Sequence, residues 1–97
     1  MTAYVDPMRR VIPSKRWPWP SACHLYADTL DELHALANRI GLILPWFQRR
    51  QDFPHYDLTA PKRRRALRAG AVETTPQHAV RFMRRARRRR HKQEKPQ

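Results

Sequence analysis

The alternation of apolar and polar positions predicts three short strands, at residues 3–5, 22–27 and 71–73. Successive side chains of a strand point to opposite faces of a sheet, so Cys23 and His24 are expected on different faces. Cys23 is then buried and chemically inert. The chain is left without a candidate for a nucleophilic cysteine.

Apolar positions at helical spacing predict three helices. The first begins with a capping box of Thr29 and Glu32, in which each side chain satisfies a free backbone N–H of the other residue, and it ends at Gly41. The second spans about residues 60–69. In the third, the apolar stripe stops at Ala86, so the helix is expected to leave the body of the protein or to fray there.

The segments between these elements are predicted to be loops. Residues 7–21 are expected to be extended, because the WPWP motif at 17–20 cannot be helical. Proline lacks an N–H donor and pushes the preceding residue out of the helical region. Residues 51–58 are also predicted to be a loop, after one helical turn that begins at Pro45.

The order strand, loop, strand, helix, helix, strand, helix indicates an α/β fold. Helices that connect strands favour a small three-stranded parallel or mixed sheet with three helices, followed by a basic C-terminal helical tail. A chain of 97 residues has room for one domain. We therefore expect a single small domain over residues 1–86 and a basic tail over residues 87–97.

Positive charge is concentrated in the last third of the chain. The sequence has 21 Lys and Arg against 8 Asp and Glu, a formal net charge of +13. Residues 62–97 carry 14 of these basic residues and two of the acidic ones. Such asymmetry indicates a polyanionic partner, nucleic acid first and an anionic membrane surface second. The alternative is a solvated tail that binds nothing.

Composition excludes several other classes of protein. No apolar run approaches the ~18 residues of a membrane span, and the N-terminus lacks the apolar core of a secretory signal. An intracellular location without a membrane partner is expected. A single cysteine excludes a disulfide framework and a cysteine-only zinc site. The two glycines, Gly41 and Gly70, are accounted for as helix terminators, which excludes a glycine-rich phosphate loop.

Two basic clusters are candidates for nucleic-acid binding. In residues 84–90, six of seven positions are arginine, whose guanidinium group matches phosphate geometry and stays charged. The helix at 60–69 carries cations in its first turns, an arrangement that opposes the helix dipole but favours a bound phosphate. The alternative for both is cations that point into solvent. The predicted binding residues are Lys62, Arg63, Arg64, Arg65, Arg68, Arg84, Arg85, Arg87, Arg88, Arg89 and Arg90.

A group of imidazoles and carboxylates is the candidate for metal binding or catalysis. Its members are His24, Asp28, His55 and Asp57. Such ligands suit zinc, manganese or iron, and beside basic helices they would permit metal-dependent cleavage of nucleic acid. Each residue also has a plain structural alternative as a half-buried strand histidine, a helix cap or a turn residue. No cofactor other than this divalent metal is expected.

Aromatic residues near the basic ones offer surfaces on which bases can stack. Trp46 and Phe47 are expected in the core, because a chain this short needs large rings there. For Trp17 and Trp19, in the proline-rich loop, base stacking, packing and docking against a protein partner all stay open.

Several short motifs stand out along residues 3–85. They are YVD at 4–6, CHLYAD at 23–28, LDELH at 30–34, WFQ at 46–48, PHYDL at 54–58, and Lys62-Arg63 through Gly70-Ala71-Val72. In this order they resemble a small bacterial and phage family, DUF4031, known as a domain of unknown function. The resemblance implies the cytoplasm of a bacterial cell or a phage-infected host. The positions that it singles out are His24, Asp28, His34, Trp46, Gln48, His55, Tyr56 and Asp57.

The sequence thus predicts a small basic protein that binds nucleic acid, DNA or RNA, mainly through phosphate contacts. Two alternatives stay open. One is a metal-dependent nuclease that uses the His/Asp group. The other is an accessory protein that docks onto a larger nucleoprotein complex, such as a polymerase, a ribosome or defence machinery.

Overall fold

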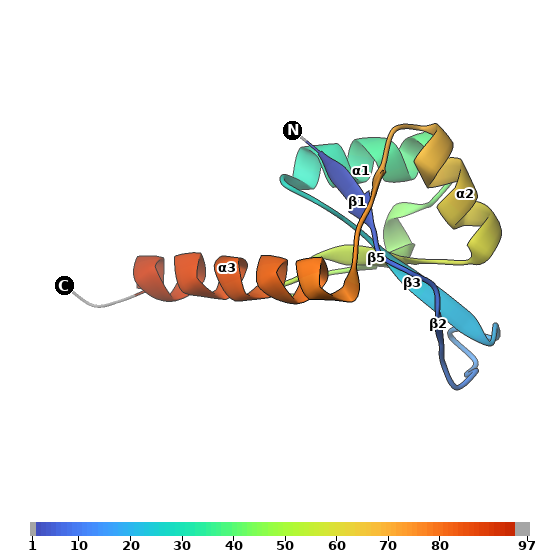
Figure 1. Cartoon of the computed structure of the whole chain (residues 1–97), viewed down its shortest axis with the longest axis horizontal. Coiled ribbons are helices and arrows are strands. Elements are labelled where there is room, and N and C mark those ends of the chain that lie inside the picture. The colour runs from blue at the N-terminus through green and yellow to red at the C-terminus, as the bar shows by residue number, and fades with distance from the viewer. Residues whose placement is uncertain (1, 95–97) are drawn as a thin grey trace.

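One mixed sheet with helices on both faces forms the structure (Figure 1). It is a computed structural model that describes residues 2–94, with the side chains of residues 2–92. The strands are β1 (Ala3–Val5), β2 (Arg9–Arg10), β3 (Ser21–Ala27), β4 (Phe47–Gln48), β5 (His55–Leu58) and β6 (Val72–Glu73). The helices are α1 (Leu30–Arg39), the 3₁₀ turn η1 (Leu44–Trp46), α2 (Ala60–Arg68) and α3 (Pro76–Glu94). None of the helices in this part of the chain combines the length and apolar character needed to cross a membrane.

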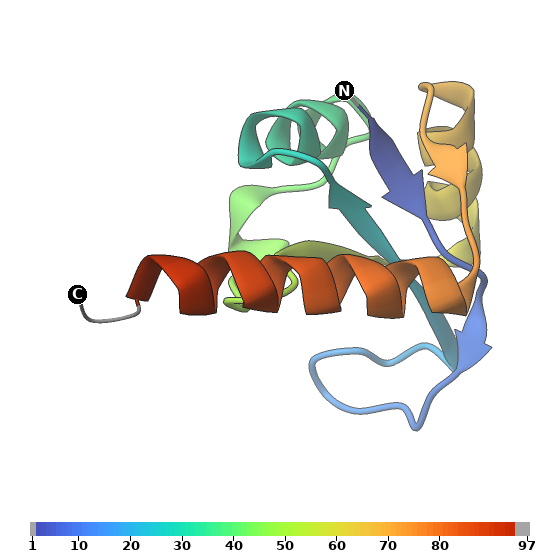
Figure 2. The same cartoon turned by 60° about the vertical axis from the view of Figure 1, so that its left-hand side comes forward.

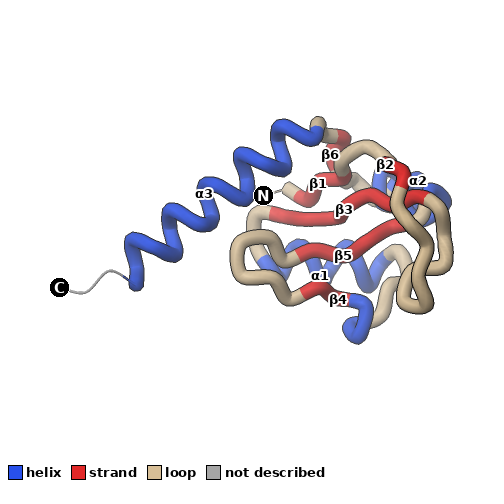
Figure 3. The backbone as a smooth tube through the Cα atoms, turned by 90° about the horizontal axis from the view of Figure 1, so that it is seen from below, coloured by secondary structure: helices blue, strands red, loops and turns tan. Residues whose placement is uncertain are grey.

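The sheet has the strand order β4-β5-β3-β1-β6, and β2 pairs with the start of β3 (Figure 3). Neighbouring strands are antiparallel, except that β6 lies parallel to β1 at one edge. The predicted α/β class with a mixed sheet and three α-helices is confirmed. The sheet has six strands rather than three.

The strands missing from the sequence prediction are β2, β4 and β5. The prediction of a loop over residues 51–58 is wrong for His55–Leu58, which form β5. The segment is four residues long and follows a proline, so its own pattern is weak. Pairing with β3, in the register Cys23↔Leu58, supplies the backbone hydrogen bonds that hold it extended. β2 and β4 have two residues each, too few for any pattern.

Helices α1 and α2 cover one face of the sheet (Figure 1). Between helices and sheet lies the main core, with Leu33 and Ala37 from α1, Ala66 from α2, and Leu25 and Leu58 from the strands. All five are buried. Because burial of a large aliphatic side chain contributes about 1.5–3 kcal/mol, this layer is the principal source of stability.

The predicted ends of α1 and α2 are confirmed. The hydroxyl of Thr29 accepts a hydrogen bond of 3.2 Å from the backbone N–H of Glu32, which is one half of the predicted capping box. The Glu32 carboxylate accepts from the Thr29 hydroxyl at 3.1 Å instead of from the Thr29 backbone N–H. Gly41 and Gly70 end the two helices with φ of +85° and +107°. A glycine adopts this left-handed conformation without the strain that a Cβ would bring.

The first half of α3 packs against the opposite face of the sheet. A second, smaller core is formed there by Tyr26, Phe53 and Ala79, with Phe82 against it. The Tyr26 hydroxyl also lies 2.7 Å from Nδ1 of His78, so a hydrogen bond joins β3 to the first turn of α3. Helix α3 therefore covers the part of this face that carries these aromatic rings.

The second half of α3 extends past the sheet (Figure 2). The helix runs unbroken over Pro76–Glu94 and crosses Ala86, where the apolar stripe ends. Asp52, in the loop before β5, pairs with Arg87 at 3.3 Å and with Arg90 at 2.9 Å. These ion pairs anchor the basic part of the helix, and the division of the chain into domain and tail stays a prediction.

Candidate functional site

Three of the four predicted metal ligands lie together on the face of the sheet that α3 covers in part. His24 in β3 is directly opposite Asp57 in β5. His55 is two positions before Asp57, so all three side chains point to the same face. One ligand atom from each residue lies within 4.8 Å of those of the other two.

Asp6, the residue directly after β1, holds His24 in place by two hydrogen bonds. Its two carboxylate oxygens accept hydrogen bonds of 2.6 Å from the backbone N–H and from Nδ1 of His24. Burial raises the pKa of Asp6, but these hydrogen bonds outweigh burial, and the pKa lies below its ordinary value of 3.8. Asp6 is absent from the predicted set of site residues. We refer to Asp6, His24, His55 and Asp57 as the polar cluster.

Arg9 in β2 closes one side of the polar cluster. Its guanidinium Nη2 donates to Nε2 of His24 across 3.0 Å. Its Nη1 also lies 3.4 Å from Nδ1 of the same ring, so the guanidinium lies against both ring nitrogens. A carboxylate oxygen can only accept, so Nδ1 carries a proton and donates it to Asp6.

His55 is the most enclosed imidazole of the polar cluster, with 6% of the residue exposed. Its Nδ1 lies 2.8 Å from the backbone oxygen of Phe53 and donates to it. Its Nε2 lies 3.5 Å from the Asp57 carboxylate. Burial raises the pKa of Asp57, but the adjacent His55 and the nearby cations outweigh this, so the pKa lies below 3.8. Asp57 is thus an ionised carboxylate.

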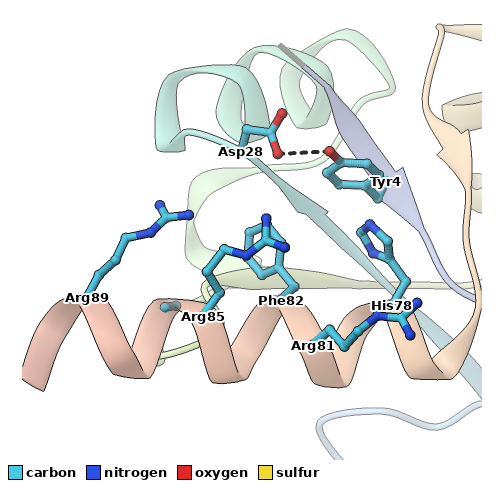
Figure 4. Close-up of a pocket in the computed structure, with 8 residues that line it drawn as sticks. Tyr4, Asp28, His78, Arg81, Phe82, Arg85 and Arg89 are labelled. Atoms are coloured by element: carbon cyan, nitrogen blue, oxygen red, sulfur yellow. Dashed lines mark hydrogen bonds between the residues drawn. The ribbon is translucent and has the colours of Figure 1, made fainter.

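Asp28, the fourth predicted ligand, lies away from the polar cluster. It is four residues beyond His24 in the sequence, and an extended chain covers about 13 Å over that distance. Its carboxylate accepts hydrogen bonds from the backbone N–H of Thr2, at 3.0 Å, and from the hydroxyl of Tyr4, at 2.9 Å (Figure 4). Asp28 therefore fixes the start of the chain and is not part of the assembled group.

An aromatic cleft of about 340 Å³ adjoins the polar cluster. Trp17 and Trp19, from the loop before β3, and Trp46 of η1 contribute its rings, and Asp57 lines it from the side of the sheet. Trp46 is 51% exposed, so the expectation that it packs in the core is wrong. Phe47 is partly buried against the main core, as expected.

The basic residues of α2 divide into structural and exposed ones. Lys62 donates from Nζ to the backbone oxygen of Ile40, at 3.0 Å, where α1 ends. Arg63 donates from Nε to the backbone oxygen of Asp6, at 2.9 Å, and so supports the polar cluster. Lys62 and Arg63 therefore stabilise the fold through these hydrogen bonds. The exposed members of the predicted set are Arg64, Arg65 and Arg68.

Arginines surround α3 from Arg81 to Arg90. One row, Arg81, Arg85 and Arg89, lines a cavity of about 210 Å³ between α3 and the Tyr4–Asp28 pair (Figure 4). Arg81 is absent from the predicted set, although its spacing of four from Arg85 is a signal for the same helix face. The exposed arginines of the predicted set on α3 are Arg84, Arg85, Arg87, Arg88 and Arg89.

Cys23 is excluded from nucleophilic chemistry, as the sequence predicts. Its side chain is fully buried in the main core. Burial raises the pKa of the thiol to about 12. The reactive thiolate is therefore almost absent at neutral pH.

A family model described as "Protein of unknown function (DUF4031)" matches residues 3–86. This chain belongs to the DUF4031 family. No curated protein and no solved structure matches it. The matched range of the DUF4031 domain includes the whole polar cluster, the residues of the aromatic cleft and the first half of α3, whereas residues 87–90 lie beyond it.

This DUF4031 chain presents two surfaces with different chemistry. Within the matched range, the polar cluster offers imidazole and carboxylate groups beside an aromatic cleft. The second half of α3 instead offers guanidinium groups, which bind phosphates in pairs of parallel hydrogen bonds. The first surface can hold a cation, and the second can hold a polyanion.

Proposed function

We propose that this protein binds nucleic acid through its phosphate backbone and that α3 makes the main contact. The observation that carries the proposal is the set of exposed arginines around the second half of α3, which extends past the sheet (Figure 2). A polyanion lying along this helix would release its condensed counterions, and that release is the main source of affinity in phosphate binding.

Within residues 2–92, whose side chains the structure describes, few acidic groups compensate these arginines. Asp52 is shared by Arg87 and Arg90. Cations three or four residues apart on a helix repel each other by about 0.2–0.5 kcal/mol per pair, and a bound polyanion would relieve that repulsion. The described arginines on α3 without an ion pair to an acidic side chain are Arg81, Arg84, Arg85, Arg88 and Arg89.

The row of Arg81, Arg85 and Arg89 indicates that the nucleic-acid backbone runs along the axis of α3. Residues four apart are separated by about 6 Å along a helix axis. The three guanidinium groups can therefore reach different phosphates of one backbone that follows α3 along the cavity of Figure 4. Such contacts provide affinity without reading base sequence.

Helix α2 contributes less to the proposed contact. It lies on the opposite face of the sheet from α3 (Figure 1), so the two helices do not form one continuous surface. Lys62 and Arg63 are held by backbone oxygens within the fold. The exposed pair Arg64 and Arg65 therefore serves as a charge-matched control for α3.

Fluorescence anisotropy with labelled duplex DNA, single-stranded DNA and RNA tests the proposal, in buffer with EDTA and across a salt series. Two double variants are compared with the wild type: Arg85→Gln with Arg89→Gln on α3, and Arg64→Gln with Arg65→Gln on α2. On duplex DNA, each lost phosphate contact should make the salt slope shallower by about 0.9. We expect a loss for the α3 pair only. Equal losses in both pairs, or no change in either, would contradict a specific role of α3.

Metal-dependent cleavage of nucleic acid is the second candidate function, favoured by the polar cluster on the open part of the sheet. It predicts loss of the labelled probe on addition of Mn²⁺ with the wild type and an intact probe with Asp57→Asn. Equal degradation by both proteins would identify a contaminating nuclease and remove this candidate.

A further inference from the structure

Both imidazoles of the polar cluster donate a hydrogen bond from Nδ1, to different partners. In His55, Nδ1 donates to the backbone oxygen of Phe53 at 2.8 Å. In His24, Nδ1 donates to the carboxylate of Asp6 at 2.6 Å. Histidines that bind metals usually donate one ring N–H to a carboxylate or backbone oxygen, which fixes the ring and leaves the other nitrogen as the ligand. In both rings Nε2 is therefore the nitrogen that can act as a metal ligand, and in His24 it also lies 3.0 Å from Nη2 of Arg9.

Nε2 of His55 faces a carboxylate oxygen of Asp57 at 3.5 Å, and only 6% of His55 is exposed. Because Nδ1 is bound to the backbone oxygen of Phe53, Nε2 is the nitrogen that His55 can offer to a metal ion. Either a proton or a metal ion can lie between Nε2 and the Asp57 carboxylate.

The second imidazole favours a metal ion over a proton. His24 lies perpendicular to His55, with ring centroids 4.9 Å apart, and its ligand atom lies within 4.8 Å of those of His55 and Asp57. A proton would join only two of these atoms. A metal bonded at about 2.0–2.2 Å holds its ligand atoms roughly 3–4 Å apart, so the cluster needs to contract by about 1 Å to bind one ion.

We propose that His24, His55 and Asp57 bind one divalent transition-metal ion. Two imidazoles and a carboxylate suit zinc, manganese, iron, cobalt or nickel rather than calcium or magnesium. Asp6 and the Phe53 carbonyl orient the two rings. Asp57 also lines the aromatic cleft, so the coordination positions that the protein leaves free face a space where a substrate or water can enter. Three protein ligands with an open position are typical of catalytic metals.

Arg9 competes with the metal for His24. Its guanidinium lies against both ring nitrogens of His24, 3.0 Å from Nε2 and 3.4 Å from Nδ1, and its positive charge opposes a metal ion at Nε2. Arg9 is exposed on a two-residue strand, so its side chain can turn into solvent. Removal of Arg9 should therefore strengthen metal binding, and this effect is a specific test of the proposed site.

The site stands independently of nucleic-acid binding, because it is tested without nucleic acid. Tag-free protein stripped with EDTA is titrated with Co²⁺, read by its visible absorption bands, and with Zn²⁺, read by calorimetry. We expect one equivalent of either ion. Binding should be lost in Asp57→Asn and in His24→Gln, and it should weaken about 10–100-fold in Asp6→Asn. Arg9→Gln should raise affinity about two- to fivefold, the size expected of one exposed charge contact.

Asp28→Asn and His34→Gln are the matched controls, because both residues lie outside the polar cluster. They should bind metal as the wild type does. Nitrogen NMR of the wild type gives a readout that does not depend on folding of a variant: Zn²⁺ should shift Nε2 of His24 and His55 while Nδ1 stays protonated. Unchanged Nε2 signals in excess Zn²⁺, or full binding by Asp57→Asn, would overturn the proposal.

Discussion

The carboxylate of Asp6 holds His24 at two points, through its backbone N–H and through Nδ1 of its ring, each at 2.6 Å. The first bond ties the end of β1 to β3, and the second keeps a proton on Nδ1 of the imidazole. One buried carboxylate thus serves both the sheet and the polar cluster.

Asp6→Asn should destabilise the fold. The amide keeps an acceptor for one bond but loses the negative charge that strengthens both, and a hydrogen bond to a charged group is worth about 1.5–3 kcal/mol. We expect the free energy of unfolding, measured in urea, to fall by that amount. Glu73→Gln is the control, since its pair with Arg63 spans 3.6 Å at the surface and should contribute less than about 1 kcal/mol. Equal effects of the two substitutions would argue against the role given to Asp6.

Asp52 should release the second half of α3 at low pH. The hydrogen bond from Arg90, together with that from Arg87, holds the pKa of Asp52 below its ordinary value of 3.8. A carboxyl with a lowered pKa stabilises the folded state above the unfolded value and loses that contribution as the pH falls through the folded value. We expect amide relaxation at residues 87–92 to report greater motion below pH 3.8. Asp52→Asn should show this motion at neutral pH, and a rigid helix in that variant would contradict the anchor.

Cys23 should resist alkylation while the protein is folded. The rise of its pKa from 9.0 to about 12 lowers the thiolate fraction about 1,000-fold at neutral pH, because each unit is tenfold. Iodoacetamide should therefore react at least that much more slowly with the native protein than with the urea-unfolded chain. Comparable rates in the two states would show that the main core opens readily around β3.

Trp46→Ala should barely change stability. The indole is 51% exposed and lines the aromatic cleft, so its truncation should cost less than about 1 kcal/mol of the free energy of unfolding. Leu58→Ala, at a fully buried position, should cost about 2–5 kcal/mol. Urea unfolding of both variants gives the comparison. A large loss of stability in Trp46→Ala would contradict the exposed position of Trp46 and indicate that it packs in the core.

The parts of the fold that the sequence predicts are those whose causes are local. The capping pair Thr29 and Glu32 and the terminator Gly41 define α1 within a dozen residues of chain. β5 is different, because its extended form depends on hydrogen bonds to β3, more than 30 positions earlier in the sequence. A window along the chain contains no information on that pairing.

The site could be predicted in part for the same reason. Residue chemistry singles out His24, His55 and Asp57, and the structure brings them together. Asp28 has the same chemistry, but its distance along β3 takes it to another part of the surface. Asp6 and Arg9 reach His24 because β1 and β2 both pair with β3, and that geometry is invisible before the sheet is known.

The most direct test of the central claim is the salt dependence of nucleic-acid binding by the unmodified protein in EDTA. We predict that log K for duplex DNA falls linearly with log salt, with a slope of about −3 to −5, as expected for roughly three to six phosphates contacted by α3 at about −0.9 each. A slope near zero, or no binding at low salt, would contradict phosphate recognition by the arginines of α3.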